Sequence, residues 1–194
     1  MNPAQGRQAH PTLDHGSTTA AAQLERARAI ASSVPDPEIP VVNLEELGIL
    51  RDVQRAGSTI VVTLTPTYTG CPATEAIRQD VHDALAAGGF DAVRVDVVLS
   101  PPWTTDWISE TGRRKLREYG IAPPAPVGTT CATPVVIRFV DRKNAAAARA
   151  PDLPACPLCG SGDSELLSEH GSTPCKALYR CRSCREPFDY FKPY

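Results

Sequence analysis

The chain has 194 residues, 42% of them hydrophobic, which is enough to bury one ordinary core and to support one small additional module. Its formal net charge of -2 provides no global field that would collect nucleic acid or anionic lipid, so we expect neither as a partner. No apolar run approaches the roughly 18 residues that span a bilayer, and the N-terminus lacks the apolar stretch of a secretory signal, so we expect a cytoplasmic protein.

The first 48 residues divide into a polar segment, a helix-forming segment and a proline-containing loop. Residues 1–17 have no periodic apolar pattern and are predicted to form a disordered tail. Residues 18–34 carry apolar side chains at helical spacing, which predicts a first helix. The three prolines of "PDPEIP" then exclude a helix, whereas Asn43, Glu46 and Gly48 have the spacing of a capped helix of one or two turns.

The next segments predict a small sheet. Residues 48–66 contain two alternating runs around the turn "AGS", which indicates a hairpin, and "DAVRVDVVLSP" alternates as a third strand. A helix over residues 72–87 lies between them, and another is expected over residues 105–119. The predicted fold class is therefore α/β (α+β), a small two-layer domain of α-β-β-α-β order over residues 18–122, with its helices on one face of the sheet.

The C-terminal part contains two C-x-x-C pairs after a break in composition. Residues 123–155 are rich in proline and alanine and are predicted to form a linker, so we expect the parts on either side to have separate cores. Residues 156–194 hold Cys156 and Cys159, then Cys181 and Cys184, with 21 residues between the pairs. This spacing predicts a C-terminal zinc ribbon with one structural Zn²⁺, in preference to a rubredoxin-like iron site or to four ordinary thiols.

Several side chains around these pairs have more than one interpretation. Cys175 lies between the pairs, either as a substitute ligand or as a spare thiol. Four basic residues flank the second pair and are expected to offset the charge of four thiolates; they are Lys176, Arg180, Arg182 and Arg185. Five aromatic residues serve either packing or docking; they are Tyr179, Phe188, Tyr190, Phe191 and Tyr194.

Residues 103–117 also leave two interpretations open. Trp103 and Trp107 are expected to fasten the following helix to the sheet. Alternatively, the two tryptophans and a nearby basic cluster together form a surface that binds an acidic partner. If they do not, the basic cluster is an ordinary solvated face. The members of this cluster are Arg113, Arg114, Lys115 and Arg117.

Cys71 stands between a glycine and a proline where a strand-like run gives way to a helix-like run. Proline is favoured at the first helical position, so Pro72 there makes Cys71 the expected N-cap. The helix dipole then predicts a lowered pKa for the Cys71 thiol. The residues alone leave open whether Cys71 is a turn residue or a functional thiol.

Two segments, "DPEIPVVNLEELGILRDV" and "TPTYTGCP", resemble the small α/β family that includes the bacterial SufT proteins and the eukaryotic cytosolic iron-sulfur targeting factors. The resemblance covers residues 18–122 and implies iron-sulfur cluster assembly or transfer. The matching positions are Asp36, Glu38, Thr69 and Cys71, which the resemblance makes candidates for transient binding of iron or of an iron-sulfur cluster.

Two further segments, "SPPWTTDWISETGRRKLREYGIAPP" and "CKALYRCRSCREPFDYFKPY", resemble the PaaD family of bacterial phenylacetic acid degradation. This resemblance implies an accessory protein that assists iron or cluster insertion into the oxygenase or reductase subunit of the phenylacetyl-CoA epoxidase. The alternative is a non-catalytic structural subunit of that complex. An enzyme with Cys71 as nucleophile is disfavoured because no histidine is placed as its base. The long 121–155 segment departs from the family pattern.

Overall fold

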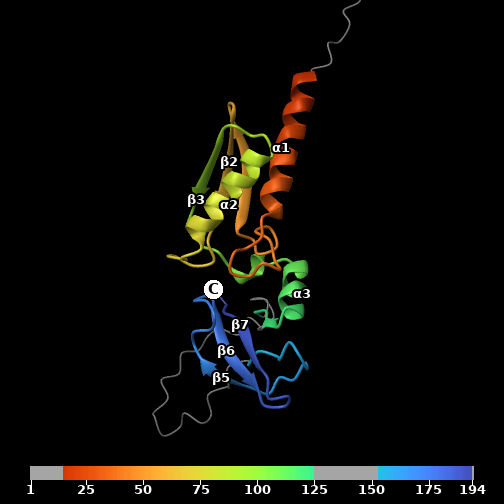
Figure 1. Cartoon of the computed structure of the whole chain (residues 1–194), viewed down its shortest axis with the longest axis vertical. Coiled ribbons are helices and arrows are strands. Elements are labelled where there is room, and N and C mark those ends of the chain that lie inside the picture. Colours follow the sequence, from red (N-terminus) through yellow and green to blue (C-terminus); the bar gives the residue numbers. More distant parts are fainter. Residues whose placement is uncertain (1–14, 125–152, 194) are drawn as a thin grey trace, which may run out of the picture.

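The computed structural model describes residues 15–124 and 153–193. Figure 1 shows two parts stacked along the long axis, with the N-terminal helices and sheet at one end and the C-terminal sheet at the other. Most of the predicted linker lies outside the described residues. Within the described ranges, no helix is long and apolar enough to cross a membrane.

The N-terminal part is a three-stranded sheet covered by two helices. Strands β1 (Leu50–Ala56) and β2 (Thr59–Leu64) form an antiparallel hairpin, and β3 (Val93–Val97) pairs with β2 in parallel. Helices α1 (His15–Ser33) and α2 (Thr74–Ala87) contact each other and pack against this sheet (Figure 1). The predicted class and the α-β-β-α-β order are confirmed. Helix α1 begins at His15, so it extends into the end of the segment predicted as a tail.

The short helix predicted at residues 43–48 is present only as hydrogen-bonded turns, one of which has the helical bond from the Leu47 amide to the Asn43 carbonyl at 3.1 Å. The Glu46 amide donates to Asn43 Oδ1 at 2.8 Å, and the Asn43 amide donates to Glu46 Oε2 at 3.0 Å. These two bonds are the reciprocal pair of a capping box. The backbone nevertheless forms only consecutive turns, because the chain must reverse at Gly48, which has a φ of +70°, to enter β1.

The helix predicted over residues 105–119 is wrong in its start and its continuity, because the structure divides this segment. A 3₁₀ turn, η1 (Thr105–Trp107), is followed by extended backbone at Ile108 and then by α3 (Glu110–Glu118). Ser109 caps α3, since its hydroxyl accepts a hydrogen bond from the Gly112 amide at 3.0 Å. The 3₁₀ turn η1 therefore ends at Trp107, and α3 begins as a separate helix with Ser109 as its own N-cap.

The C-terminal part is a four-stranded sheet that includes a strand from the N-terminal part. The sheet order is β4-β7-β6-β5, where β5 (Ser164–Ser168), β6 (Lys176–Cys181) and β7 (Pro187–Phe191) form an antiparallel meander. Strand β4 (Ile121–Ala122) follows α3 directly and pairs with β7 in parallel. The two parts of the chain are thus joined by backbone hydrogen bonds.

The expectation of separate cores is wrong, because side chains of the ribbon belong to the main core. Phe191 and Cys175 are buried in the same cluster as the residues of α1, α2 and the first sheet. Trp103 provides the contact, with its ring centroid 5.9 Å from that of Phe191, and its Nε1 donates to the Leu47 carbonyl at 2.9 Å. Trp103 therefore fastens the ribbon, as well as its own segment, to the N-terminal part.

Gly48 offers a first test of this packing. A Cβ added to Gly48 would lie 2.5 Å from Trp107 Cβ and 2.7 Å from the Trp107 carbonyl oxygen. Since the φ of Gly48 is also positive, we expect Gly48→Ala to lower the free energy of unfolding by about 3 kcal/mol. Chemical denaturation measures this change.

Gly57→Ala is the matched control. Gly57 has a φ of +65° but no neighbouring atom within 4 Å of an added Cβ. Only backbone strain applies there, so we expect a loss of about 1 kcal/mol. Equal losses in the two variants would show that the contact with Trp107 is unimportant.

Candidate functional site

The four paired cysteines converge at one end of the ribbon. Cys156 and Cys159 precede β5, Cys181 ends β6, and Cys184 lies in the turn before β7. Their Sγ atoms all lie within 4.8 Å of one another, with 3.8 Å between Cys156 and Cys184 and 3.5 Å between Cys159 and Cys181. Sulfur atoms bound tetrahedrally at ~2.3 Å would be about 3.8 Å apart, so the donor set fits a structural tetrathiolate metal ion such as Zn²⁺.

The two turns around these cysteines have matching backbone conformations. Gly160, which follows the first pair, has a φ of +75°, and Arg185, which follows the second pair, has a φ of +69°. The arginine therefore adopts the conformation that the glycine adopts with less strain. The Cys184 amide donates to Cys181 Sγ at 3.5 Å, and this bond is the largest of several that together lower the pKa of the Cys181 thiol to about 6. Backbone donors of this kind favour the thiolate that a metal requires.

The basic residues near the second pair have other partners. Arg180 and Arg182 both pair with Glu165 on the neighbouring strand. Lys176 lies at the opposite end of β6, where it is buried and its Nζ is 3.5 Å from Asp189 Oδ2. The expectation that Lys176 offsets the charge of the thiolates is therefore wrong.

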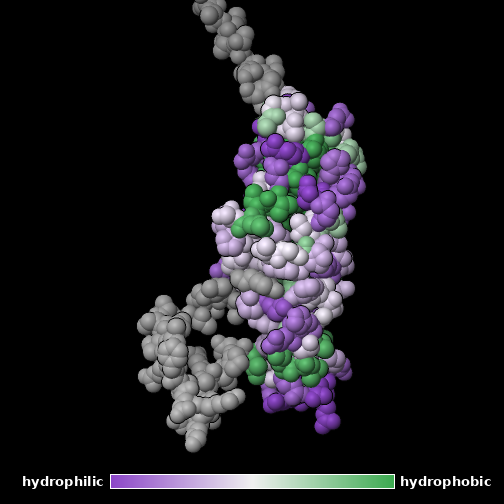
Figure 2. All heavy atoms as spheres, turned by 90° about the vertical axis from the view of Figure 1, so that its left-hand side faces the viewer, coloured by the Kyte–Doolittle hydropathy of each residue, from purple (hydrophilic) through white to green (hydrophobic). Residues whose placement is uncertain are grey.

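The aromatic residues of the described ribbon serve packing. Phe188, Tyr179 and Tyr190 cover a second cluster that contains Cys156 and Cys181. The Tyr179 ring stacks on Phe188 at 6.0 Å and meets Tyr190 edge-on at 5.6 Å. Figure 2 shows apolar surface on the ribbon part, beside a hydrophilic tip, and a further apolar area on the N-terminal part. The large exposed apolar residues of the described C-terminal part are Leu153, Leu158, Leu166 and Leu167. Tyr194 lies outside the described residues.

The basic cluster of α3 is largely engaged within the chain. Arg113 is buried and donates to the Thr105 carbonyl at 2.6 Å and to the Pro124 carbonyl. Lys115 Nζ is 2.7 Å from Glu46 Oε1, and Arg114 pairs with Glu118. The buried Arg113 holds η1 against the residues that follow β4, so it is a structural residue rather than part of a solvated face.

Cys71 does not cap the following helix, which corrects the prediction. Helix α2 begins at Thr74, and Ala73 occupies the N-cap position. The Cys71 thiol is half-buried, and this burial raises its pKa, although hydrogen bonds from the Ala73 amide and from the Thr74 and Tyr68 side chains lower it. The charge of Glu38 raises this pKa further. Burial therefore outweighs the donors near the helix N-terminus, and the thiol is favoured over the thiolate.

The two acidic residues of the loop 35–40, the acidic loop, differ in burial, because Asp36 is buried and Glu38 is half-buried. Asp36 is buried, and its Oδ1 accepts hydrogen bonds from the Glu38 and Ile39 amides, both at 2.9 Å. Asp36 thus folds the loop. Glu38 instead directs its carboxylate across the boundary between the two parts, where its Oε2 is 3.9 Å from Cys175 Sγ. Burial raises the pKa of both carboxyl groups.

The four positions taken from the family resemblance are not equally close to one another. The charge of Glu38 raises the pKa of the Cys71 thiol, and the charge of Asp36 in turn raises the pKa of Glu38. Thr69 is exposed and lines a separate groove with Leu99 and Trp103. One residue beside Cys71 was missed at the level of sequence, namely Tyr68, which directly precedes the candidate Thr69 in the chain. Cys175, which was considered only as part of the ribbon, lies beside Glu38 instead, and no local signal relates these two residues.

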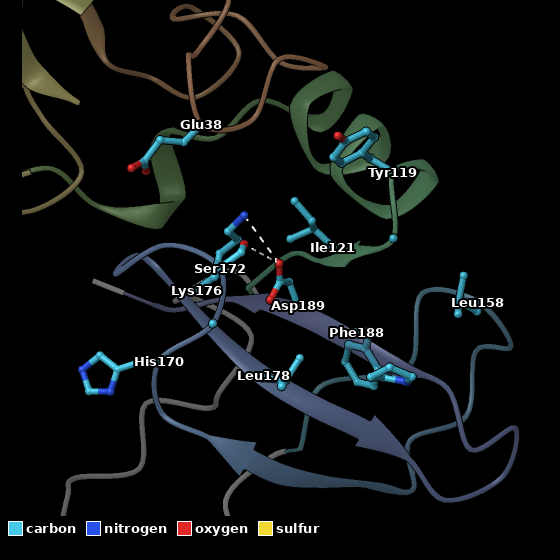
Figure 3. A pocket seen from close by; sticks show the side chains of 13 residues that line it. Glu38, Tyr119, Ile121, Leu158, His170, Ser172, Lys176, Leu178, Phe188 and Asp189 are labelled. Atoms are coloured by element: carbon cyan, nitrogen blue, oxygen red, sulfur yellow. Dashed lines mark hydrogen bonds and ion pairs between the residues drawn. The ribbon is translucent and has the colours of Figure 1, made fainter. Parts of the chain in front are cut away.

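A groove of about 730 Å³ lies at the boundary between the N-terminal part and the ribbon, and Glu38 and Lys176 both line it. Figure 3 shows Glu38 on the N-terminal side of this groove and Lys176, Ser172 and Asp189 on the ribbon side. Ser172 donates to Asp189 Oδ2 at 2.8 Å, so Asp189 is shared between the serine hydroxyl and the lysine. The cation of Lys176 is thereby held beside the two acidic residues of the loop, Asp36 and Glu38.

Two family models match the chain, and together they define its class. The model described as "Iron-sulfur cluster assembly protein" matches residues 25–97. The model described as "PaaD zinc beta ribbon domain" matches residues 141–192. The chain is thus similar to an iron-sulfur cluster assembly domain followed by a ribbon of the PaaD type.

Individual relatives narrow this class. An Escherichia coli protein, named as a putative 1,2-phenylacetyl-CoA epoxidase subunit, is 46% identical over 175 residues, which cover 90% of this chain and 96% of the relative. The chain belongs to the PaaD family. A Porphyromonas gingivalis protein named "Fe-S protein maturation auxiliary factor" is 36% identical over 43% of this chain and 81% of its own length. A solved domain of unknown function from Bacillus anthracis is 29% identical, with a TM-score of 0.48, and covers 52% of this chain and 96% of its own.

Proposed function

We propose that this protein is an accessory factor that assists insertion of iron or an iron-sulfur cluster into the oxygenase or reductase of the phenylacetyl-CoA epoxidase. The observation that carries this proposal is the half-buried Cys71 thiol, which lies beside Glu38 and outside the four-cysteine centre. The names of the relatives, an epoxidase subunit and a maturation factor, support it. The four-cysteine centre would hold zinc and keep the ribbon folded.

The environment of Cys71 favours a metal ligand over an enzymatic nucleophile. A nucleophilic cysteine needs a base or a cation that favours its thiolate, and the charged neighbour of Cys71 is the carboxylate of Glu38. This negative charge disfavours a free thiolate. It does not oppose metal binding, because the metal displaces the thiol proton and adds positive charge next to the carboxylate. We therefore expect an accessory rather than a catalytic role.

The proposal predicts the effect of Cys71→Ala in cells that coexpress the epoxidase. We expect the variant to keep its fold and its ribbon metal, while the iron content and the activity of the epoxidase fall several-fold. Glu38→Ala and Asp36→Ala should cause smaller losses, the second through the shape of the loop. Iron analysis of the purified epoxidase and its turnover measure these effects. If the epoxidase that is coexpressed with Cys71→Ala contains as much iron as with the wild-type protein, Cys71 is only a turn residue.

A structural subunit is the alternative, and copurification separates the two. A structural subunit remains with the epoxidase at fixed stoichiometry, whereas a maturation factor is absent from the mature enzyme.

Thr69→Ala tests the fourth candidate residue. Loading that falls as in Cys71→Ala would assign Thr69 to the same site, and normal loading would remove it from the candidate set.

A further inference from the structure

We infer that the groove lined by Thr69, Leu99 and Trp103 binds an uncharged, largely apolar segment of the client polypeptide, which is the oxygenase or the reductase of the epoxidase. This inference rests on the proposed function and deepens it, because it names the surface that the client contacts. The groove has a volume of about 330 Å³.

The groove lies at the carboxyl ends of two adjacent parallel strands. Strand β2 ends at Leu64 and β3 ends at Val97, and these two residues pair in the sheet. One wall of the groove comes from residues 65–69, which follow β2, and the other from residues 99–103, which follow β3. Figure 1 shows β3 running toward the ribbon, so the groove lies at the end of the sheet that faces the ribbon. Crevices outside the carboxyl ends of parallel strands are favoured places for ligands in α/β sheets.

A buried hydroxyl group in the wall of the groove lacks a partner. Thr65 is 1% exposed and lines the groove, and its Oγ1 has no hydrogen-bond partner among residues 15–124 and 153–193. A buried hydroxyl without a partner costs free energy. A backbone amide or carbonyl group of a bound polypeptide would offset this cost.

The rest of the lining explains why the ligand should be uncharged. None of the described residues that line the groove carries a charge, and four of them contribute apolar surface, namely Pro66, Leu99, Pro102 and Trp103. Leu99 is 53% exposed, so part of this surface faces solvent. A charged group of a ligand would lose its hydration here without gaining an opposite charge. An apolar side chain flanked by backbone amides fits both the apolar surface and the Thr65 hydroxyl.

The wall of the groove leads directly to Cys71. Tyr68 lines the groove, and the Cys71 amide donates to the Tyr68 carbonyl at 3.3 Å in the turn that follows. A polypeptide segment in the groove is therefore held next to the thiol to which the proposed function assigns delivery. Proximity to Cys71 matters for a client that receives iron and not for a second copy of this chain, so the client is the expected occupant.

The test measures binding of the purified oxygenase and of the purified reductase, each prepared without iron, to the full-length protein by isothermal titration calorimetry. We expect the wild type to bind one of them. Leu99→Asp should weaken this binding at least about 10-fold, because it places a charge in the uncharged groove. Thr65→Val should weaken it about 5-fold through the loss of one hydrogen bond. Its melting temperature should not fall, because the lost hydroxyl has no partner among the described residues.

Two variants serve as matched controls. Thr105 is also buried and its Oγ1 also lacks a partner among the described residues, but Thr105 does not line this groove. Thr105→Val should therefore resemble Thr65→Val in stability and bind the client like the wild type. Leu166→Asp introduces the same charge as Leu99→Asp at an exposed leucine of β5, and it should also bind like the wild type. Far-UV circular dichroism establishes that each variant is folded, and Leu99→Asp decides if Thr65→Val is not.

Three results overturn the inference: no binding by the wild type, wild-type affinity in Leu99→Asp, or equal weakening by the groove variants and their controls. Sedimentation of the protein alone tests the other occupant. A dimer that Leu99→Asp dissociates would assign the groove to a second copy of the chain and also overturn the inference.

The outcomes distinguish this inference from the proposed function. Each of the contrary results leaves the proposed function standing if Cys71→Ala still lowers the iron content of the epoxidase. Specific binding through the groove together with normal iron loading beside Cys71→Ala would instead retain the groove as the docking site and remove the role in delivery.

Discussion

Replacing Cys156 and Cys181 together by serine is expected to abolish metal binding by the ribbon and to unfold it. Both side chains are buried at the point where the two turns meet, and the ribbon has only a small apolar cluster of its own. Binding of a structural Zn²⁺ contributes on the order of 10 kcal/mol to folding in small domains of this kind. Serine hydroxyls do not replace thiolates as ligands, so this contribution is lost.

The shared core determines how far the damage extends. Because Phe191 and Cys175 belong to the main core, we expect residues 15–124 to remain folded but with a lower melting temperature. Metal analysis and thermal denaturation followed by circular dichroism measure both effects. Ser183→Ala, in the same turn but with an exposed side chain, is the control and should retain its metal. Full metal retention in the double variant would rule out these four cysteines as the site.

Truncating Phe191 is expected to lower the free energy of unfolding of the whole chain by about 4 kcal/mol. Its ring is 1% exposed and packs against Trp103, whose own ring is buried against the N-terminal part. The loss of this ring leaves a cavity between the ribbon and the main core. Urea denaturation, followed by tryptophan fluorescence, measures the change because Trp103 lines the cavity.

Phe188→Ala is the matched control for Phe191→Ala. Phe188 lies three residues earlier on the same strand and is also buried, but it packs in the second cluster with Cys156 and Cys181. We expect Phe188→Ala to destabilise the ribbon while the tryptophan fluorescence transition, to which Trp103 and Trp107 both contribute, changes less. If the two variants shift that transition equally, the two clusters unfold as one unit. If Phe191→Ala leaves it unchanged, the cores are independent.

The elements that depend on local pattern could be predicted from the sequence. The β1–β2 hairpin follows from alternation of apolar residues around Gly57, and α2 follows from buried side chains at Ile77, Val81 and Leu85. The four ribbon cysteines were also recognisable, because each C-x-x-C turn places two sulfur atoms together without help from the rest of the fold. In each case a few neighbouring residues contain the whole signal.

Contacts that join distant segments were decided only by the tertiary structure. Burial reverses the direction expected for the pKa of Cys71, since desolvation depends on what covers the turn. Likewise, pairing of β4 with β7 brings the ribbon against the acidic loop, so that Cys175 and Glu38, 137 residues apart, become neighbours. Spacing along the chain contains no information about such a pair, because the distance between the two residues is set by how the ribbon packs against the N-terminal part.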